Sequence, residues 1–458
     1  MKSTDPPNNS FFQPNPEDHD DATKLLLNAD DTAYGTIDQN EGSSSSATKR
    51  SLVHANKRPV HVITLLMGVL FGMALVGSTR LAVSMRNAKK SASLQTKKVP
   101  KGPYRLIQRQ EGEEMFDYYD FYNGPDNVGS NGYINYVTKE SAMNSGILRV
   151  TEEADLSYMS NPAERTEHVN KTQFVYMGSA PTDAGPRDSI RLEGKSKFNG
   201  GLFVIDLHHM PAGCGSWPAV WLSDEKDWPL NGEIDIVEGV NYQKVAKTAL
   251  HTSKGCDMED SPSNLTTGGW DTAVGIPDSE TGVPDMTFRY AKNCYVYAPH
   301  QWTNQGCVAT DAKEGNLGEP LNAKGGGVFA LEWDPYYRHI RSWVFSPHGS
   351  VPDNLKKSIL TSGEADPVVP DTQTWGLPYG YFPIGEGTGC SESHFKHMRL
   401  IVNLAFCGSV AGNRYFMDCP KQYERFKKCD DYIASDDDEL NEAYWKIRGI
   451  YVFQREWK

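Results

Sequence analysis

The run Glu233-Ile-Asp-Ile-Val-Glu238 combines the apolar pattern of a buried β-strand with three carboxylates in six positions. Ionised carboxylates are costly to remove from water, so a strand that served packing alone would carry Val, Ile or Leu at those positions. The run therefore predicts a strand with one face in an apolar core and an opposite face that needs acids. A solvated edge strand is the competing interpretation, and the interleaved Ile234, Ile236 and Val237 disfavour it.

Strand geometry places the three acids on one face only if the run contains a bulge. Side chains alternate across a strand, so Glu233 and Asp235 share a face and Glu238 falls on the other. One extra residue in a β-bulge at Ile236-Val237 returns Glu238 to the first face. The two glutamates are then roughly 13 Å apart between α-carbons, at a rise of about 3.3 Å per residue. Their long side chains can close that gap to the roughly 5–5.5 Å of a retaining carboxylate pair.

Two carboxyl groups beside aromatic rings are the groups that glycoside cleavage requires. One carboxylate attacks or stabilises the anomeric carbon, and one carboxylic acid protonates the leaving oxygen. Trp217, Trp221 and Trp228 lie close to the acids in sequence, and aromatic faces suit the C–H faces of a sugar. The shorter Asp235 is expected to tune its neighbours and to help keep Glu238 protonated near neutral pH.

At these residues the chain resembles glycoside hydrolase family 16, and most closely its fungal-type laminarinases, the endo-β-1,3(4)-glucanases. The resemblance runs from about Tyr104 to the C-terminus. It implies an all-β fold, a concanavalin-like β-jelly-roll sandwich with a concave glucan cleft. The matching motifs, in order, include Asn135-Tyr-Val, Arg187-Asp-Ser-Ile-Arg191, His209-Met-Pro-Ala-Gly-Cys214, Glu238-Gly-Val-Asn241, Leu250-His-Thr252, Asn304-Gln-Gly-Cys307, Asn403-Leu-Ala-Phe-Cys-Gly408 and Ala443-Tyr-Trp445.

The resemblance also implies roles for individual residues. Glu233 matches the nucleophile, Asp235 the assisting acid and Glu238 the general acid/base. Laminarinases of this type often carry a Trp at the position of Val410, so this chain lacks one stacking platform and its subsite preference is open. No cofactor or metal is expected, and no residue pattern supports a structural calcium ion. The substrate-binding residues implied are Arg191, Trp217, Trp221, Trp228, Asn241 and His251.

Residues 102–458 show the short apolar runs and Gly/Pro/Asn/Asp loops typical of a sandwich. Residues 257–290 and 346–390 lack a strand pattern, and loops of that length are expected to form cleft walls. A short helix is predicted near residues 438–445. The predicted strands outside the acidic run cover residues 202–207, 328–333, 339–345, 400–404 and 450–453.

The first hundred residues differ in composition. Residues 1–58 are polar without apolar periodicity, which predicts a disordered cytosolic tail. Residues 60–78 predict a transmembrane signal-anchor, because 60–77 contain no Asp, Glu, Lys or Arg. A cleaved signal peptide is the alternative, and the long polar segment before the apolar run disfavours it. Residues 79–101 form a basic stalk, so the catalytic part is residues 102–458.

The cysteines favour a single-pass type II membrane protein with a lumenal or extracellular catalytic domain. All eight lie between Cys214 and Cys429, and an even count in one domain suits an oxidising compartment. Close spacing makes Cys294–Cys307 or Cys419–Cys429 candidate local disulfides. A zinc site is disfavoured because no C-x-x-C pair occurs. Sequons at Asn170 and Asn264 lie on the same side of the apolar segment.

Charge narrows the class of partner. Of the chain's 46 basic and 59 acidic side chains, 13 and 9 lie in residues 1–101, which leaves 33 and 50 (net −17) for the catalytic part. A domain of that sign repels nucleic acid and anionic glycans and favours a neutral polysaccharide.

Three functions fit the residues, all with β-glucan as the partner. The first is a retaining endo-acting hydrolase of β-1,3- or mixed β-1,3/1,4-glucan that forms a covalent glycosyl-enzyme. The second is a transglycosylase that remodels or branches β-glucan during its assembly, with a sugar hydroxyl in place of water. The third is a catalytically silent glucan-binding lectin, which the presence of both Glu233 and Glu238 disfavours.

Overall fold

The computed structural model describes residues 100–457, apart from 128, 156–170, 184, 278–280, 361–367 and 436–437. The tail expected at residues 1–58, the transmembrane segment expected at 60–78, nearly all of the stalk and the sequon residue Asn170 lie outside the described residues. Within the described part, no helix is long and apolar enough to cross a membrane.

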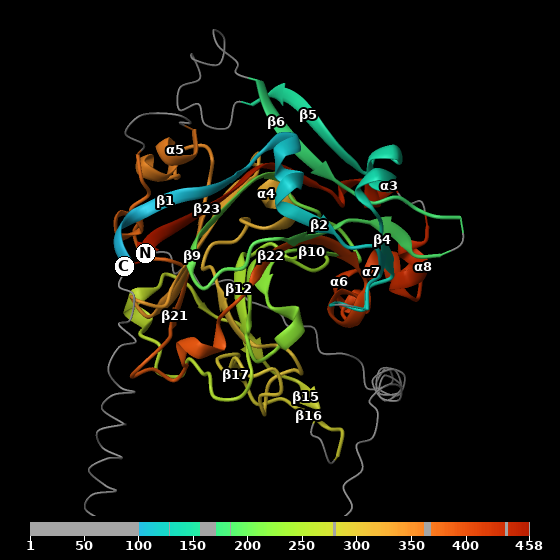
Figure 1. Cartoon of the computed structure of the whole chain (residues 1–458). Helices are drawn as coiled ribbons and strands as arrows, with labels where there is room; N and C mark the ends of the chain where they lie inside the picture. Colours follow the sequence, from blue (N-terminus) through green and yellow to red (C-terminus); the bar gives the residue numbers. More distant parts are fainter. Residues whose placement is uncertain are drawn as a thin grey trace, which may run out of the picture. The chain divides into compact units, whose positions relative to one another are not determined.

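Two antiparallel sheets of eight strands each form the body of residues 100–457 (Figure 1). In the first sheet the strand order is β21-β20-β19-β9-β23-β6-β5, and β1 pairs with β23 beside this path. Its strands are β1 (Pro100–Gln110), β5 (Leu148–Ala154), β6 (Lys171–Met177), β9 (Gly201–His209), β19 (Gly327–Asp334), β20 (His339–Phe345), β21 (Gly380–Pro383) and β23 (Trp445–Trp457).

The second sheet carries the acidic run on a central strand. Its order is β13-β18-β12-β11-β10-β22-β8-β2. Its strands are β2 (Tyr119–Phe121), β8 (Arg191–Gly194), β10 (Ser216–Ser223), β11 (Glu233–Glu238), β12 (Lys247–His251), β13 (Gly269–Trp270), β18 (Cys307–Thr310) and β22 (Arg399–Phe406).

The main apolar core lies between the two sheets, because both contribute alternate residues to it. Phe203 and Leu331 come from the first sheet, and Val220, Ile234 and Val402 from the second; all are fully buried. The predicted β-sandwich is confirmed, and every strand predicted outside the acidic run is present as β9, β19, β20, β22 or β23. The short helix expected before the last strand is a 3₁₀ turn, Asp438–Glu442.

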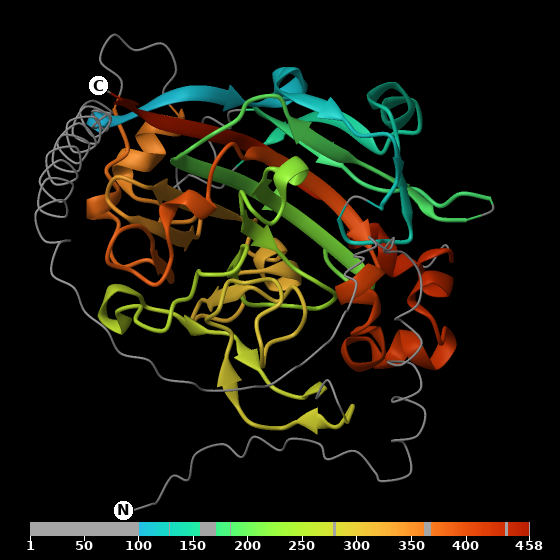
Figure 2. The same cartoon turned by 60° about the horizontal axis from the view of Figure 1, so that its bottom comes forward.

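Short elements fill the long loops. In the described parts of these ranges, residues 257–290 hold one 3₁₀ turn, β13 and four further strands of two residues each, and 346–390 hold one α-helix, one 3₁₀ turn and β21. Figures 1 and 2 show α6, α7 and α8 gathered at one end of the sandwich and β15 and β16 projecting from its body. The remaining strands are β3 (Gly124–Pro125), β4 (Ile134–Tyr136), β7 (Arg187–Ser189), β14 (Thr272–Ala273), β15 (Ile276–Pro277), β16 (Pro284–Asp285) and β17 (Arg289–Tyr290). The helices are α3 (Lys139–Asn144), α4 (Gly318–Asn322), α5 (Asp353–Leu360), α6 (Tyr415–Asp418), α7 (Pro420–Arg425) and α8 (Cys429–Ile433).

Four disulfides pair all eight cysteines: Cys214–Cys419, Cys256–Cys390, Cys294–Cys307 and Cys407–Cys429. The local bridge Cys294–Cys307 is confirmed. The alternative local bridge Cys419–Cys429 is wrong, because Cys419 pairs with Cys214 and Cys429 pairs with Cys407. Cys214 precedes β10 and Cys407 follows β22, so these two bridges attach the α6–α8 segment to the ends of neighbouring strands.

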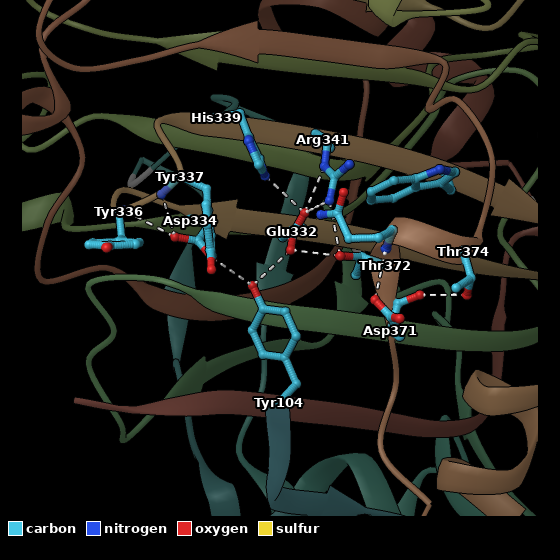
Figure 3. Close-up of polar contacts among 12 residues, drawn as sticks. Tyr104, Glu332, Asp334, Tyr336, Tyr337, His339, Arg341, Asp371, Thr372 and Thr374 are labelled. Atoms are coloured by element: carbon cyan, nitrogen blue, oxygen red, sulfur yellow. Dashed lines mark hydrogen bonds and ion pairs between the residues drawn. The ribbon is translucent and has the colours of Figure 1, made fainter. Parts of the chain in front are cut away.

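A buried polar cluster lies on the face of the first sheet that points away from the main core (Figure 3). Glu332 is its centre and is fully buried. Its carboxylate accepts hydrogen bonds from the Tyr104 hydroxyl at 3.0 Å and the Thr372 hydroxyl at 2.9 Å. Arg341 Nε donates to it over 2.7 Å, and His339 Nε2 lies 3.0 Å away. The cluster joins β1, β19, β20 and the loop before β21.

Candidate active site

The predicted bulge brings the three acids to one face of β11. β10 pairs Val220 with Val237 and Trp221 with Asp235, so Ile236 is the extra residue. Ile236 and Val237 are both buried in the main core. The strand positions of Glu233, Asp235 and Glu238 then share the opposite face, as the spacing predicted.

The same face collects polar side chains from five neighbouring strands. Register links them directly: Arg191 pairs with Asn403, and Glu233 pairs with His251. We call this set the catalytic row. It consists of Arg191 from β8, Asn403 from β22, Trp221 from β10, Glu233, Asp235 and Glu238 from β11, and His251 from β12.

His251 is a buried cation between two acids. Its Nε2 lies 3.0 Å from Asp235 Oδ2 and 3.9 Å from Glu233 Oε1. The Asp235 contact is an ion pair when the ring is protonated. On the other side of the ring, Nδ1 donates to Asn304 Oδ1 over 3.1 Å. Burial favours the neutral ring, but the contact with Asp235 and the charge of Glu233 outweigh it and raise the pKa of His251 to about 9.

Burial also raises the pKa of all three acids. Burial and then the charge of Asp235 raise the pKa of Glu233 to about 7. Burial, opposed by His251, raises the pKa of Asp235 to about 6. The pKa of Glu238 is raised by burial and by the charge of Glu233, and lowered by a hydrogen bond from Trp217. A raised pKa suits a proton donor near neutral pH. All three acids share this direction, so the pKa shift does not distinguish a proton donor from a nucleophile.

The three tryptophans expected to line sugar subsites have different surroundings. Trp217 is half-buried and donates its indole N–H to Glu238 Oε1 over 2.7 Å, so it orients that carboxyl group. Trp221 is buried and donates to Asn403 Oδ1 over 2.9 Å, which places it in the floor of the row. Trp228 is half-buried before β11, and its indole is one of the groups that lower the pKa of Glu233.

Arg191 and Asn241 are held by protein groups. Arg191 is 1% exposed and forms ion pairs with Glu193 at 3.0 Å and with Glu225. Asn241 is buried after β11 and donates to Asp418 Oδ2 over 3.0 Å. Both therefore support the floor of the row or the loop beside it, and their direct contact with a sugar stays a prediction.

Two asparagines of the site were in matching motifs without an assigned role. Asn403 accepts from Trp221 and donates to the Tyr136 hydroxyl over 3.2 Å. Its sequence signal is the one that marks the acids, a polar residue inside the apolar run 400–404. Asn304 holds His251 from a loop, where no periodic pattern exists to reveal it.

Among the described residues, Glu233, Asp235 and His251 offer three ligand atoms within 4.8 Å of one another, which is compatible with a metal ion. Such an ion would occupy the carboxylate oxygens that attack on a sugar needs. The raised pKa of His251 also favours the protonated ring, and a protonated ring nitrogen cannot bind a metal. The arrangement therefore fits acid–base and nucleophilic chemistry better than metal binding.

Comparison with known proteins agrees with this geometry. Residues 119–453 match the family model of the XgeA-like catalytic GH16 domain. A probable endo-1,3(4)-beta-glucanase of Aspergillus fumigatus is 35% identical over 355 residues, which cover 77% of this chain and 45% of that protein. The chain thus spans less than half the length of this relative.

Two solved structures share the fold. Laminarinase 16A from Phanerochaete chrysosporium, solved with β-glucans in its donor and acceptor sites, is 28% identical with a TM-score of 0.59. An elongating GH family 16 β-1,3-glucosyltransferase is 28% identical with a TM-score of 0.57. Each match covers 77% of this chain and 100% of the other. The chain belongs to glycoside hydrolase family 16 and carries its laminarinase-like β-jelly-roll domain.

Proposed function

We propose that this chain is a retaining, endo-acting hydrolase of β-1,3- or mixed β-1,3/1,4-glucan. The observation that carries the proposal is the bulged strand β11, which presents Glu233, Asp235 and Glu238 on one face beside His251. The similarity to a probable endo-1,3(4)-beta-glucanase and to a laminarinase solved with β-glucan supports the same substrate class.

The reaction has two steps with balanced proton movement. The Glu233 carboxylate attacks the anomeric carbon, and Glu238 gives its proton to the departing glycosidic oxygen, which forms a glycosyl-enzyme ester and a shortened glucan. Glu238, now ionised, takes a proton from water, and the resulting hydroxide cleaves the ester with a second inversion. The Asp235–His251 ion pair holds a positive charge beside Glu233, and Trp217 keeps Glu238 in place.

The matched test uses both glutamates. Glu233→Gln is expected to lower turnover of laminarin by several orders of magnitude and to keep oligosaccharide binding. Glu238→Ala is expected to act only on substrates with good leaving groups and to be partly rescued by azide, with a β-glycosyl azide as product. An α-azide, or full activity in either variant, would overturn the assignment of roles.

Transglycosylation is the second candidate, and the elongating glucosyltransferase among the structural relatives favours it. In that reaction a glucan hydroxyl, in place of water, gives its proton to Glu238 and attacks the glycosyl-enzyme. Product analysis on laminarin separates the two candidates. Reducing ends that accumulate with shortened chains indicate hydrolysis, and lengthened or branched chains without a net gain of reducing ends indicate transfer.

An oxidising compartment is the proposed setting of the catalytic domain. Four disulfides support it, since such bonds persist mainly in secretory compartments and outside the cell. The sequon residue Asn264 is exposed and therefore accessible to glycosylation. Together with the apolar run 60–77, this supports type II topology. Protease added to sealed microsomes is expected to remove only residues 1–58, and digestion of the disulfide-bonded domain would reverse the topology.

A further inference from the structure

A loop closed by the Cys294–Cys307 disulfide lies directly against the catalytic row. Asn304 accepts the hydrogen bond from His251, and Tyr295 forms a parallel β-bridge with Thr252, the residue after His251. Gly306 permits the close approach: at φ +67° a side-chain β-carbon there would lie 2.4 Å from the Leu250 carbonyl oxygen. The loop therefore continues the catalytic row beyond β12, on the side away from Arg191.

This loop exposes two large aromatic side chains. Tyr297 is 60% exposed and Trp302 is 41% exposed. Neither ring is part of the two main buried apolar clusters of the described residues. Gln305 ties the loop to β14 through a 2.9 Å hydrogen bond to the Thr272 carbonyl, and β14 pairs with β17. β17 carries another exposed ring, Tyr290, in this separate two-stranded sheet.

The residues of the loop are suited to a neutral sugar chain. Exposed aromatic rings stack on the C–H faces of glucose, and amide groups serve its hydroxyls. Asn304 supplies such an amide, and it is exposed while its carbonyl oxygen holds His251. Its φ of 56° is in the left-handed region, which asparagine adopts more readily than most non-glycine residues.

We propose that Tyr297 and Trp302 form an aromatic platform that binds β-glucan beyond the sugars held over the catalytic row. The proposal rests on the proposed function, since a polymer that crosses the row from Arg191 towards His251 reaches this loop next. Protein binding is the competing use of an exposed aromatic surface. Continuity with the catalytic row and the hydrogen bond to His251 favour the glucan.

The test measures how affinity depends on chain length. In a Glu233→Gln background, binding of laminari-oligosaccharides from laminaribiose to laminariheptaose is measured by titration calorimetry. Trp302→Ala is expected to weaken the longest oligosaccharide about tenfold, equivalent to about 1.4 kcal/mol, and to leave the shortest that binds unchanged. Trp302→Phe is expected to restore most of the loss, and Tyr297→Ala to behave like Trp302→Ala.

The matched control is Tyr336→Ala. Tyr336 is a 43% exposed aromatic in the turn between β19 and β20, on the other sheet, and its removal is expected to change no affinity. An unchanged length dependence in Trp302→Ala overturns the platform while the proposed function stands. A uniform loss at every length also overturns it, since that indicates distortion of His251. Failure of the Glu233→Gln protein itself to bind any laminari-oligosaccharide overturns the proposed function.

Discussion

At the scale of single residues, tryptophan and histidine neighbours give the three acids of the row different surroundings. Trp217 donates to Glu238, which favours the ionised carboxylate and so opposes the rise in pKa that burial causes. Asp235 and Glu233 have a buried cation, His251, between them instead. The three acids therefore have different electrostatic surroundings on one face of a single strand.

Trp217→Phe tests this arrangement. Phenylalanine keeps an aromatic ring and removes the N–H donor, so the pKa of Glu238 should rise. In the proposed mechanism Glu238 acts as a protonated acid, so the basic limb of the pH dependence of kcat/KM should move to higher pH. Hydrogen bonds to charged groups contribute about 1.5–3 kcal/mol, so the expected shift is at least about one pH unit.

Trp221→Phe is the control for that change. It also removes a buried indole donor, but its partner is Asn403 and not an acid. In Trp221→Phe the basic limb of the pH dependence of kcat/KM should therefore stay in place, even if the protein loses stability. An identical shift in both variants would show that general disturbance of the row, and not the Glu238 hydrogen bond, moves the limb.

The three acids could be predicted from sequence because they violate the apolar pattern of a buried strand. His251 could be assigned to the cleft only by resemblance. It lies 18 positions after Glu233 in the sequence, and only the antiparallel register of β11 with β12 pairs the two residues. Asn304 lies further still, on a loop without periodicity. Residue spacing predicts which side chains share a face of one strand. It does not predict which residue of a neighbouring strand lies beside them.

At the scale of elements, tight backbone contact between a loop and a strand holds the end of the catalytic row. Gly306 and Gly275 both have φ in the left-handed region, at +67° and +74°. A β-carbon at Gly275 would meet nothing within 4 Å, whereas one at Gly306 would meet the Leu250 carbonyl at 2.4 Å and His251 Nδ1 at 3.0 Å. The two positions thus share the conformational strain and differ in the steric clash.

Alanine at each position separates these two effects. Gly275→Ala should cost about 1 kcal/mol of unfolding free energy, from left-handed strain alone. Gly306→Ala should cost about 1–3 kcal/mol more, the range for forced overpacking, and should also lower kcat because His251 must move. Denaturant unfolding and initial rates on laminarin check both. Equal losses in the two variants would show that the loop yields without strain and does not hold His251.

The bulge in β11 could be derived from sequence because a one-residue slip would put Glu238 in the core. The disulfide pairing could not, except for Cys294–Cys307, whose cysteines are 13 residues apart. Cys214 and Cys419 are 205 residues apart and meet only because β10 and β22 are neighbours in the second sheet. Close spacing favoured the wrong partner for Cys419, since strand order decides long-range contacts.

At the scale of the whole molecule, two groups of buried carboxyls have pKa values that are shifted in opposite directions. Those of the catalytic row have raised pKa values, because they are buried and lie beside other acids. Glu332 of the polar cluster differs: burial alone would raise its pKa, but hydrogen bonding to His339 and the charge of Arg341 lower it to about 2 (Figure 3). The row faces the candidate active site, and the polar cluster joins strands of the first sheet.

Glu332 should therefore make the fold sensitive to acid. Its ordinary pKa is 4.5 and its folded pKa is about 2, so the folded state binds fewer protons between these values. The resulting stabilisation, on the order of 3 kcal/mol, is fully present above pH 4.5 and is lost as pH falls towards 2. Glu332→Gln removes this contribution and leaves Arg341 buried without its partner, so it should cost about 3–5 kcal/mol at neutral pH.

Urea unfolding of Glu332→Gln and of the unaltered protein, between neutral pH and the lowest pH at which both fold, measures the difference. The difference should be constant above pH 4.5 and should shrink below it, since acid protonates Glu332 in the unaltered protein. Glu386→Gln is the control: its ion pair with Arg338 is exposed, and such pairs contribute about 0–1 kcal/mol. A difference between Glu332→Gln and the unaltered protein that stays the same at every pH would mean that Glu332 is held by packing and not by its charge.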